Sequence, residues 1–431
     1  MGVIKNQDIY LVMHRSLSMV DKEITEHGKE VGYILYKMLV SQNKYFLQEL
    51  IDYTTIGVLH DIGLYKSPDQ ETIHREETKN VWKHSIYGFL FLKYFSPLGN
   101  KAEIVLYHHL DYSKYQLINS AHIEVAEYLA FADKLDTFMR SSNEDRDAEF
   151  FAKQSGVRFS ERAKQVFLNA EKKYQIFENI RTGAYEEELA ALLRKKLTSE
   201  EQKRNFLEML IYTIDFRSEH TVVHSLATTT FAVEIAKLMH LPAADIYNIY
   251  YGALLHDIGK LVTPVEILES PRRLNEDEMR IMQEHVVNSE KILRGTIDDT
   301  VLEIAIRHHE KLDGSGYHRG LKGEDLTIPQ RIVAVADIIS ALYGKRSYKD
   351  SFDIERIKEI LMADSDAGKL CPEVVGYAVR NMKWLVRNFE KKKEKTIGNY
   401  ILIKEQYEEI YNKFKQFELE EEGQNEVPIK Y

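Results

Sequence analysis

The chain repeats one ordered series of histidines and aspartates, and this repeat constrains its fold more than any other feature. Corresponding members of the two series lie between 196 and 204 residues apart in the 431-residue sequence. Their contexts match as well, as in GVLHDIG at 57–63 and GALLHDIG at 252–259. Recurrence in the same order at one offset indicates an internal duplication, so we expect two domains of one fold. The first series is His27, His60, Asp61, His84, His108, His109 and Asp133, and the second is His224, His256, Asp257, His285, His308, His309 and Asp337.

The spacing of apolar residues predicts helices in both halves. In 224–241, apolar side chains recur at intervals that place them on one helical face. Asn275 and Glu278 form a capping signal at the start of a predicted helix over 275–293. Strand patterns are weak throughout, so we expect an all-α fold. The expected domains are an N-terminal domain at 1–145, a helical connector at 146–215, a second domain at 216–365, and C-terminal helices with a charged tail at 366–431.

Composition excludes several classes of protein. The formal net charge of −10 argues against binding to a DNA or RNA duplex, because phosphate backbones are usually bound by a basic excess. No apolar run approaches the roughly 18 residues that a membrane span requires. Cys371 is the only cysteine, which leaves neither an intramolecular disulfide nor a thiolate metal cluster. We therefore expect a cytoplasmic protein.

The repeated residue types are suited to a metal centre with more than one ion. Two neighbouring cations need a bridging carboxylate and neutral imidazoles that complete each coordination shell. A His-Asp pair at a helix end supplies a terminal ligand and a bridge, and a pair of adjacent histidines aims two rings into one cavity. Nitrogen and oxygen donors without thiolate favour iron, manganese or another first-row divalent metal over structural zinc. An apolar helix that carries the single acid Asp337 also needs a cation or a hydrogen-bond network.

Residues 217–350 resemble the HD-GYP branch of the HD-domain metal-dependent phosphohydrolases. The matching segments are HTVVHS, LLHDIGK, MQEH, RHHEKLDGSGYHRGL, VADIISAL and RSYK. The resemblance implies hydrolysis of a cyclic dinucleotide, cyclic di-GMP or 3′,3′-cyclic GMP-AMP, to a linear dinucleotide and further to mononucleotides. It implies two or three metals bound by the second series, with Asp257 as the bridge. Residues implied to face the substrate are Lys260, which also serves catalysis, and Gly316, Tyr317, Arg346 and Lys349.

The sequence departs from that family at three positions. His318 stands where the signature has proline, and Ser340 stands where many relatives have a second aspartate. His220 occupies the position of a glutamate found in members with three metals, which makes it a candidate ligand for a third ion.

The N-terminal copy keeps all seven ligand-type residues but lacks the substrate features of the second copy. No glycine follows its histidine pair, and Lys66 lies two positions beyond the family lysine. We expect a second metal site there with a regulatory or dimerising role, rather than a second catalytic site. Two other functions stay open for the whole chain: a nucleotidase of the HD type, and a regulatory module that binds metal or nucleotide without turnover. A homodimer is compatible with all three.

Overall fold

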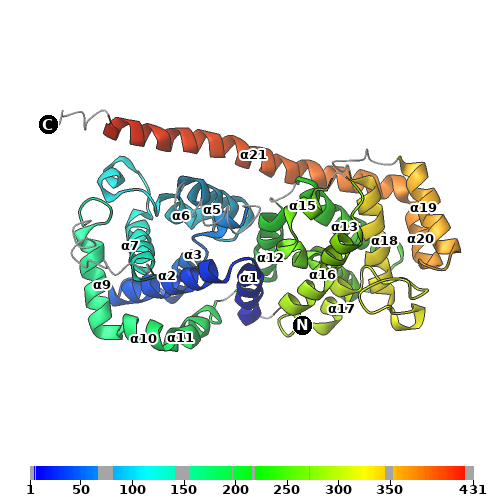
Figure 1. Cartoon of the computed structure of the whole chain (residues 1–431), viewed down its shortest axis with the longest axis horizontal. Coiled ribbons are helices and arrows are strands. Elements are labelled where there is room, and N and C mark those ends of the chain that lie inside the picture. The colour runs from blue at the N-terminus through cyan, green and yellow to red at the C-terminus, as the bar shows by residue number, and fades with distance from the viewer. Residues whose placement is uncertain are drawn as a thin grey trace. The chain divides into compact units, whose positions relative to one another are not determined.

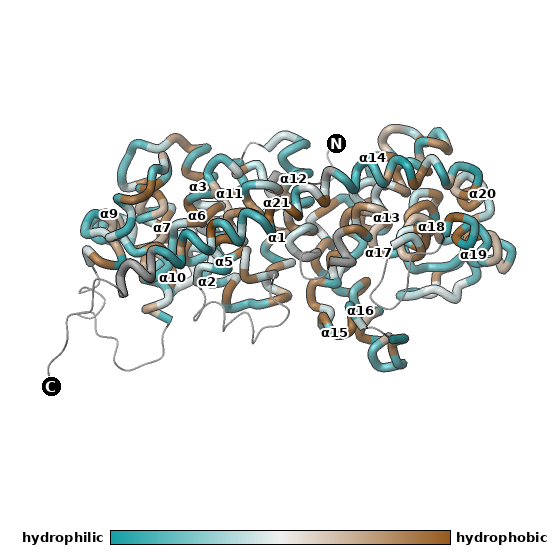
Figure 2. Tube along the Cα trace, turned by 90° about the horizontal axis from the view of Figure 1, so that it is seen from above, coloured by the Kyte–Doolittle hydropathy of each residue, from teal (hydrophilic) through white to brown (hydrophobic). Residues whose placement is uncertain are grey.

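The regular structure of the described residues is entirely helical (Figure 1), which confirms the expected all-α class. The computed structural model describes residues 4, 6–66, 81–140, 155–196, 198–215, 219–270, 272–344 and 353–422. Hydrophobic and hydrophilic residues interleave along most helices (Figure 2), as expected for helices that bury one face. Within these ranges, none of the helices combines the length and the apolar character that crossing a bilayer requires.

The chain divides into two compact units, each of which combines distant parts of the sequence. The N-terminal unit contains Asp21–Met209 and Tyr400–Tyr431, and the C-terminal unit contains Met1–Val20 and Leu210–Asn399. The domains expected from the sequence are consecutive segments, whereas each unit of the structure combines two segments that are far apart in the sequence. Two helices continue from one unit into the other: α12 (Glu200–Asp215) and α21 (Met382–Glu422).

The N-terminal unit is built around α2, which packs against α3, α7 and α9. Asp21 caps α2, since its side chain accepts a hydrogen bond from the backbone N–H of Ile24. The helices of this unit are α2 (Lys22–Ser41), α3 (Leu47–Val58), η1 (Ile62–Lys66), α5 (Val81–Phe95), η2 (Gly99–Lys101), α6 (Glu103–Tyr107), η3 (Tyr112–Leu117), α7 (Ile123–Arg140), α9 (Glu161–Tyr174), α10 (Ile176–Thr182) and α11 (Ala184–Leu193).

The C-terminal unit is built around α13, which packs against α14 and α18. Phe231 of α13 and Phe389 of α21 are both fully buried in its core, with ring centroids 5.4 Å apart. Its helices are α1 (Asn6–Val20), α13 (Glu219–Leu238), α14 (Ala243–Leu255), η4 (Ile258–Val262), α15 (Val265–Leu268), α16 (Glu276–Leu293), α17 (Asp299–Ile306), η5 (Gly323–Asp325), α18 (Ile328–Tyr343), α19 (Ile354–Asp366) and α20 (Pro372–Arg380).

Helix α1 belongs to the C-terminal unit although it begins the chain. It contacts η4 and α16, and Arg15 donates hydrogen bonds to the carbonyls of Ile292 and Arg294 at the end of α16. Ile4 also pairs through its backbone with Ile297. These contacts hold the first residues of the protein against the elements that carry part of the second histidine series.

The predicted capping signal of α16 is confirmed. The Asn275 side chain accepts from the backbone N–H of Glu278 at 2.9 Å, and the Glu278 carboxylate accepts from the Asn275 N–H at the same distance. This reciprocal pair satisfies two of the N–H groups that a helix start leaves without a partner. Helix α16 therefore begins at Glu276, and His285 lies in its third turn.

Candidate metal centres

Seven side chains of the C-terminal unit converge on one buried point, and we call them the C-terminal cluster. Three come from within helices, and four come from the two turns in which a helix ends on a pair of polar residues. The members are His224 (α13), His256 and Asp257 (directly after α14), His285 (α16), His308 and His309 (after Arg307, the C-cap of α17) and Asp337 (α18). The structure therefore brings together all seven ligand-type residues that the sequence pattern singled out.

The Asp257 carboxylate lies between two pairs of imidazoles. Its Oδ2 atom is 3.2 Å from His224 Nε2 and 3.1 Å from His256 Nε2. Its Oδ1 atom is 3.4 Å from His285 Nε2 and 3.9 Å from His308 Nε2. Because each oxygen faces a different pair of rings, the carboxylate has the geometry of a bridge between two cations.

Asp337 completes both sides of the cluster. Its Oδ1 atom is 3.1 Å from His224 Nε2, and its Oδ2 atom is 3.6 Å from His309 Nδ1. The donor atoms fall into two adjacent groups, and within each group they lie no more than 4.8 Å apart. These groups are His224, His256 and Asp257 on one side and His285, His308 and His309 on the other.

Backbone carbonyls fix the orientation of three rings. In each case the Nδ1 atom lies 2.6–2.7 Å from the carbonyl oxygen three residues earlier. A carbonyl only accepts hydrogen bonds, so Nδ1 carries a proton and Nε2 is the atom that faces the cluster. Metal-binding histidines are usually held in this way by a second hydrogen bond. The three pairs are His256 with Ala253, His285 with Met282, and His308 with Ala305.

Burial and neighbouring charges shift the pKa values of the cluster residues in different directions. Burial lowers the pKa of His285 to about 4 and that of His309 to about 3, so both rings are neutral at pH 7. Burial also lowers the pKa of His256, but the carboxylates of Asp257 and Asp337 outweigh it and raise that pKa to about 10. Burial acts to raise the pKa of Asp257, but the neighbouring cationic groups hold it well below its ordinary value. A bound cation would replace the proton of His256 beside two ionised carboxylates.

A glycine allows the His-Asp turn to approach α16. A Cβ atom on Gly259 would lie 2.0 Å from the carbonyl oxygen of His285, so no side chain fits at that position. Gly63 stands in the same relation to the carbonyl of His84 in the N-terminal unit, also at 2.0 Å. The glycine of the HDIG sequence is therefore required for the distance between the carboxylate and the helix that supplies the next histidine.

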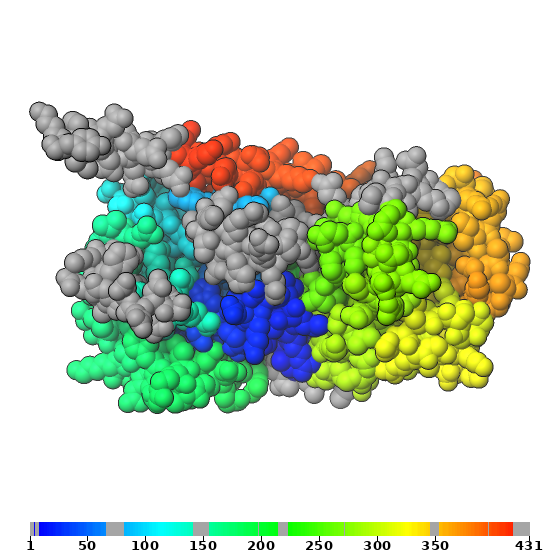
Figure 3. Space-filling model, in the orientation of Figure 1, coloured from blue at the N-terminus to red at the C-terminus, as the bar shows by residue number. Residues whose placement is uncertain are grey.

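The segment after His309 borders the C-terminal cluster and places an aromatic side chain beside it. The Tyr317 ring lies over the His309 ring, with centroids 4.6 Å apart. A Cβ atom on Gly316 would lie 2.5 Å from the Cα of Glu310, so only glycine permits the loop to fold back on itself. The loop reaches the surface (yellow in Figure 3), and His318 in it is exposed.

Two contacts near the cluster were not anticipated from the sequence. The buried Glu310 carboxylate accepts hydrogen bonds from the backbone N–H groups of Arg319 and Leu321, at 2.7 Å and 2.9 Å, and so closes the loop. Lys260 donates a 2.6 Å hydrogen bond to Oδ2 of Asp257. The sequence offered one signal for each contact. Glu310 directly follows the histidine pair, and Lys260 stands three residues after Asp257.

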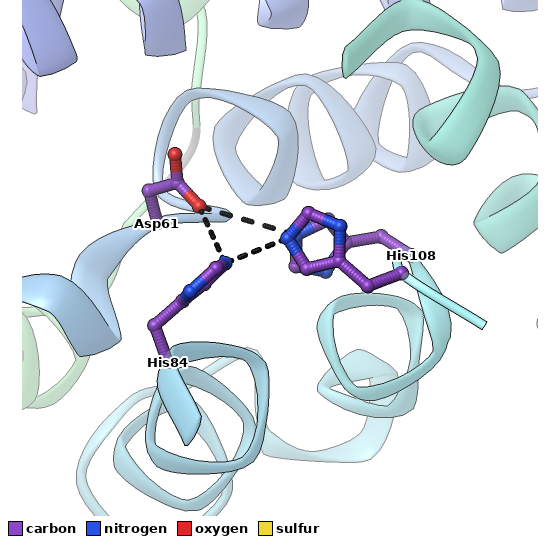
Figure 4. Close-up of side chains that lie close together, drawn as sticks. Asp61, His84 and His108 are labelled. Carbon is purple, nitrogen blue, oxygen red and sulfur yellow. Dashed lines mark hydrogen bonds and ion pairs between the residues drawn. The ribbon is translucent and has the colours of Figure 1, made fainter. Parts of the chain in front are cut away.

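The first histidine series forms an equivalent N-terminal cluster. Asp61 Oδ2 is 3.3 Å from His60 Nε2, and Asp61 Oδ1 is 3.3 Å from His84 Nε2 and 3.9 Å from His108 Nε2. Figure 4 shows Asp61, His84 and His108 pointing toward one another from three separate segments. The remaining members lie close by: His27 Nε2 is 3.2 Å from Asp133 Oδ1, and His109 Nδ1 is 3.7 Å from Asp133 Oδ2.

The donor sets fit divalent metal ions in both units. Each cluster offers five imidazoles and two carboxylates, and the N-terminal donors divide into the groups Asp61, His84, His108, His109 and His27, His60, Asp133. Nε2 of His60 and of His108 are buried without a hydrogen-bond partner, and so is Oδ1 of Asp257. Buried lone pairs without donors are costly, and a cation at the centre of each cluster would satisfy them.

Several predicted site residues lie outside the described part of the structure. They are Arg346 and Lys349, together with the side chains of His220 and Lys66. Their assignments stay predictions from the sequence.

Comparison with known proteins agrees with the duplication. Residues 24–137 and 188–367 match two families that are both described as HD domain. The 3′3′-cGAMP-specific phosphodiesterase 1 of Vibrio cholerae is 28% identical over 86% of this chain and 90% of its own length. Phosphodiesterase 2 of the same name and organism is 38% identical, over 38% of this chain and 32% of its own length. A cyclic di-GMP phosphodiesterase of Thermotoga maritima is 35% identical over 44% of this chain and 52% of its own length.

One solved structure shares the fold over most of the chain. The cyclic GMP-AMP-specific phosphodiesterase V-cGAP3 of Vibrio cholerae superposes with a TM-score of 0.55 at 19% identity, covering 89% of this chain and 98% of that one. With two matches to HD domains, this chain is a tandem HD-domain protein. Its C-terminal copy, with the HDIGK and HHEKLDGSGYH segments, belongs to the HD-GYP family.

Replacing Gly259 by alanine should destabilise the C-terminal unit. The added methyl group meets the His285 carbonyl, and an overpacked site of this kind costs about 1–3 kcal/mol. We expect the denaturation midpoint to fall and metal content to fall with it. Gly398→Ala is the control, because an added Cβ there has no neighbour within 4 Å. Equal midpoints for the two variants would contradict the role given to Gly259.

Proposed function

We propose that the C-terminal unit is a metal-dependent phosphodiesterase that hydrolyses a cyclic dinucleotide. The observation that carries this proposal is the position of Asp257, with one oxygen facing each pair of imidazoles and Lys260 donating to one of them. A site that holds two cations side by side beside a fixed ammonium group is suited to a phosphodiester, whose charge develops on oxygen as the bond breaks.

The names of the relatives support the substrate class. Proteins similar to this chain are named as phosphodiesterases specific for 3′3′-cGAMP or acting on cyclic di-GMP. We therefore propose one or both of these cyclic dinucleotides as the substrate, opened to a linear dinucleotide and cleaved further to mononucleotides. The acidic chain fits this small ligand better than a nucleic-acid duplex.

We propose two divalent ions in the C-terminal cluster, with His220 as the candidate ligand of a third. The nitrogen and oxygen donors favour iron or manganese over zinc. When bound, such ions lower the pKa of water and polarise the phosphoryl group. The ligands would be the seven residues of the cluster, with Asp257 as the bridge.

The chain's own residues have separable roles in this proposal. Asp257 fixes the distance between the two donor groups. Lys260 holds a positive charge at the edge of the site, where it offsets negative charge on the phosphoryl oxygens. Glu310 keeps the loop closed, so that Gly316 and Tyr317 stand beside His309, where a nucleotide would enter.

The N-terminal unit is proposed to regulate or to promote dimerisation rather than to catalyse. Its bridging aspartate has no lysine at the position that corresponds to Lys260, where Leu64 is fully buried. A cytoplasmic location and a homodimer remain our expectations from the sequence.

The direct test is to load the full chain with manganese or ferrous iron and offer it three types of substrate. Cyclic di-GMP and 3′,3′-cyclic GMP-AMP should yield linear dinucleotides, resolved by chromatography. The third type of substrate is a mononucleotide. Release of inorganic phosphate from it, with both cyclic dinucleotides left intact, would support the nucleotidase alternative. Tight binding of a cyclic dinucleotide without any product would support a regulatory module. Either result would contradict the proposed function.

Lys260→Ala should keep its metal and lose most of its activity. Losing one preorganised donor to a developing oxyanion costs about 100–1000-fold in turnover. The comparison variant carries both His256→Ala and Asp257→Ala. It should lose its metal and its hydrolytic activity because the bridging carboxylate is gone. Metal content by elemental analysis and turnover on the same samples separate the two cases. A Lys260 variant that lost its metal but kept activity per bound metal would refute the assigned role.

Replacing His60 and Asp61 together by alanine should leave turnover largely intact. The chemistry is assigned to the C-terminal cluster, and positioning of the substrate, which can supply about 7–11 kcal/mol of the barrier lowering, depends on the loop found there. Unpaired polar groups left in the N-terminal unit should lower its stability. If this variant were inactive while the His256/Asp257 variant turned over normally, the assignment of the catalytic unit would be reversed.

A further inference from the structure

The two clusters share their inner donors but differ in the groups that contact those donors from outside. Such outer partners tune a metal site, because they change the basicity and the charge of the ligands. Two differences are present, one at the first histidine of each series and one at the bridging carboxylate. Both act in the same direction, and a further lysine near the second aspartate is common to the two clusters: Lys134 near Asp133 and Lys311 near Asp337.

The first difference is the partner of the leading histidine. In the N-terminal unit, His27 donates from Nδ1 to the carboxylate of Asp136 at 2.6 Å. Asp136 is fully buried, and Arg140 donates to the same carboxylate at 2.6 Å, which holds it ionised and in place. An ionised acceptor polarises the Nδ1–H bond of the imidazole. This raises the electron density on Nε2 and makes it a stronger ligand for a cation.

The corresponding contact in the C-terminal unit has no charge. His224 Nδ1 lies 2.8 Å from the hydroxyl of Ser340, which donates in turn to the backbone carbonyl of His224 at 3.1 Å. Ser340 and Asp136 each stand three residues after the aspartate of their cluster, Asp337 and Asp133. The hydroxyl therefore orients the ring without raising its basicity as a carboxylate does.

The second difference lies at the bridge. In the C-terminal unit the ammonium group of Lys260 is 2.6 Å from Asp257 Oδ2 and reduces the negative potential that a cation experiences. In the N-terminal unit the corresponding residue is Leu64, which is fully buried and uncharged. No ammonium group from this position therefore offsets the charge of Asp61.

We infer that the N-terminal cluster is a metal centre that binds its cations more tightly than the C-terminal cluster does. The inference rests on the proposed metal centre of the C-terminal unit and adds the order of filling. The N-terminal centre stays loaded while the C-terminal centre exchanges its ions with the surroundings. Hydrolysis then follows the free concentration of divalent metal, because only the C-terminal centre empties as that concentration falls.

The order of filling is measured on two full-length chains that each keep one centre. The chain with His256→Ala and Asp257→Ala keeps the N-terminal cluster, and the chain with His60→Ala and Asp61→Ala keeps the C-terminal cluster. Both are stripped of metal and dialysed against Mn²⁺ at a series of buffered free concentrations, and bound manganese is counted by mass spectrometry. Losing an outer partner of a metal ligand typically weakens binding 10–100-fold, so the first chain should half-saturate at a free Mn²⁺ concentration lower by about that factor.

Exchanging the outer partners tests the cause. Asp136→Ser and the milder Asp136→Asn, added to the chain that keeps the N-terminal cluster, should move its half-saturation toward that of the other chain. Ser340→Asp, added to the chain that keeps the C-terminal cluster, should move binding in the opposite direction. Glu127→Gln is the matched control, because Glu127 is a buried carboxylate on the same helix, α7, that contacts Ser160 and Arg162 instead. Melting curves of all variants identify any that do not fold.

Three results would overturn the inference: equal affinities in the two chains, the reverse order, or folded Asp136 variants whose binding matches the Glu127→Gln control. None of these depends on hydrolysis. A chain that bound manganese in the expected order and cleaved no cyclic dinucleotide would refute the proposed function alone. Normal cleavage with the reverse order of affinities would refute this inference alone.

Discussion

The structure depends on two carboxylates buried among imidazoles in each unit. An ionised carboxylate away from water is costly, and its cost is removed only by cations or by a complete set of hydrogen bonds. Asp257 has one oxygen that is buried without a hydrogen-bond partner, and two imidazole nitrogens of the N-terminal cluster are in the same state. A cation at the centre of each cluster would compensate these charges and satisfy the atoms that have no partner.

Comparison of the two copies separates the residues that build the cluster from the residues that adapt it to a function. Both copies keep the His-Asp turn, the close-packed glycine after it, and the histidine pair at a helix end. These features set distances around the carboxylate, so a change in any of them disturbs every ligand. The residues that differ between the copies, such as Lys260 against Leu64, contact the centre from its edge. They alter its charge and its access without moving the ligands.

The sequence predicted the fold class and the convergence of the two histidine series, because both follow from local periodicity and from repetition. The capping pair of Asn275 and Glu278 was predictable for the same reason, since it needs only three residues of spacing. The contact of His27 with Asp136 was not predicted, because it joins residues 109 apart and depends on how α2 packs against α7. The function of Glu310 was missed because an acid beside two histidines fits a ligand, a surface residue or a loop clasp equally well.

The placement of α1 has a consequence for how the protein is made. This helix is translated well before its partners η4 and α16, which begin at Ile258 and Glu276. Val12, Met13 and Leu17, which are buried in the folded protein, therefore have no native surface to cover them until those elements have been made. The N-terminal unit likewise includes Tyr400–Tyr431, which is translated after the whole of Leu210–Asn399. Neither unit can close in the order in which the chain is translated, so nascent chains depend on chaperones or on delayed folding more than two consecutive domains would.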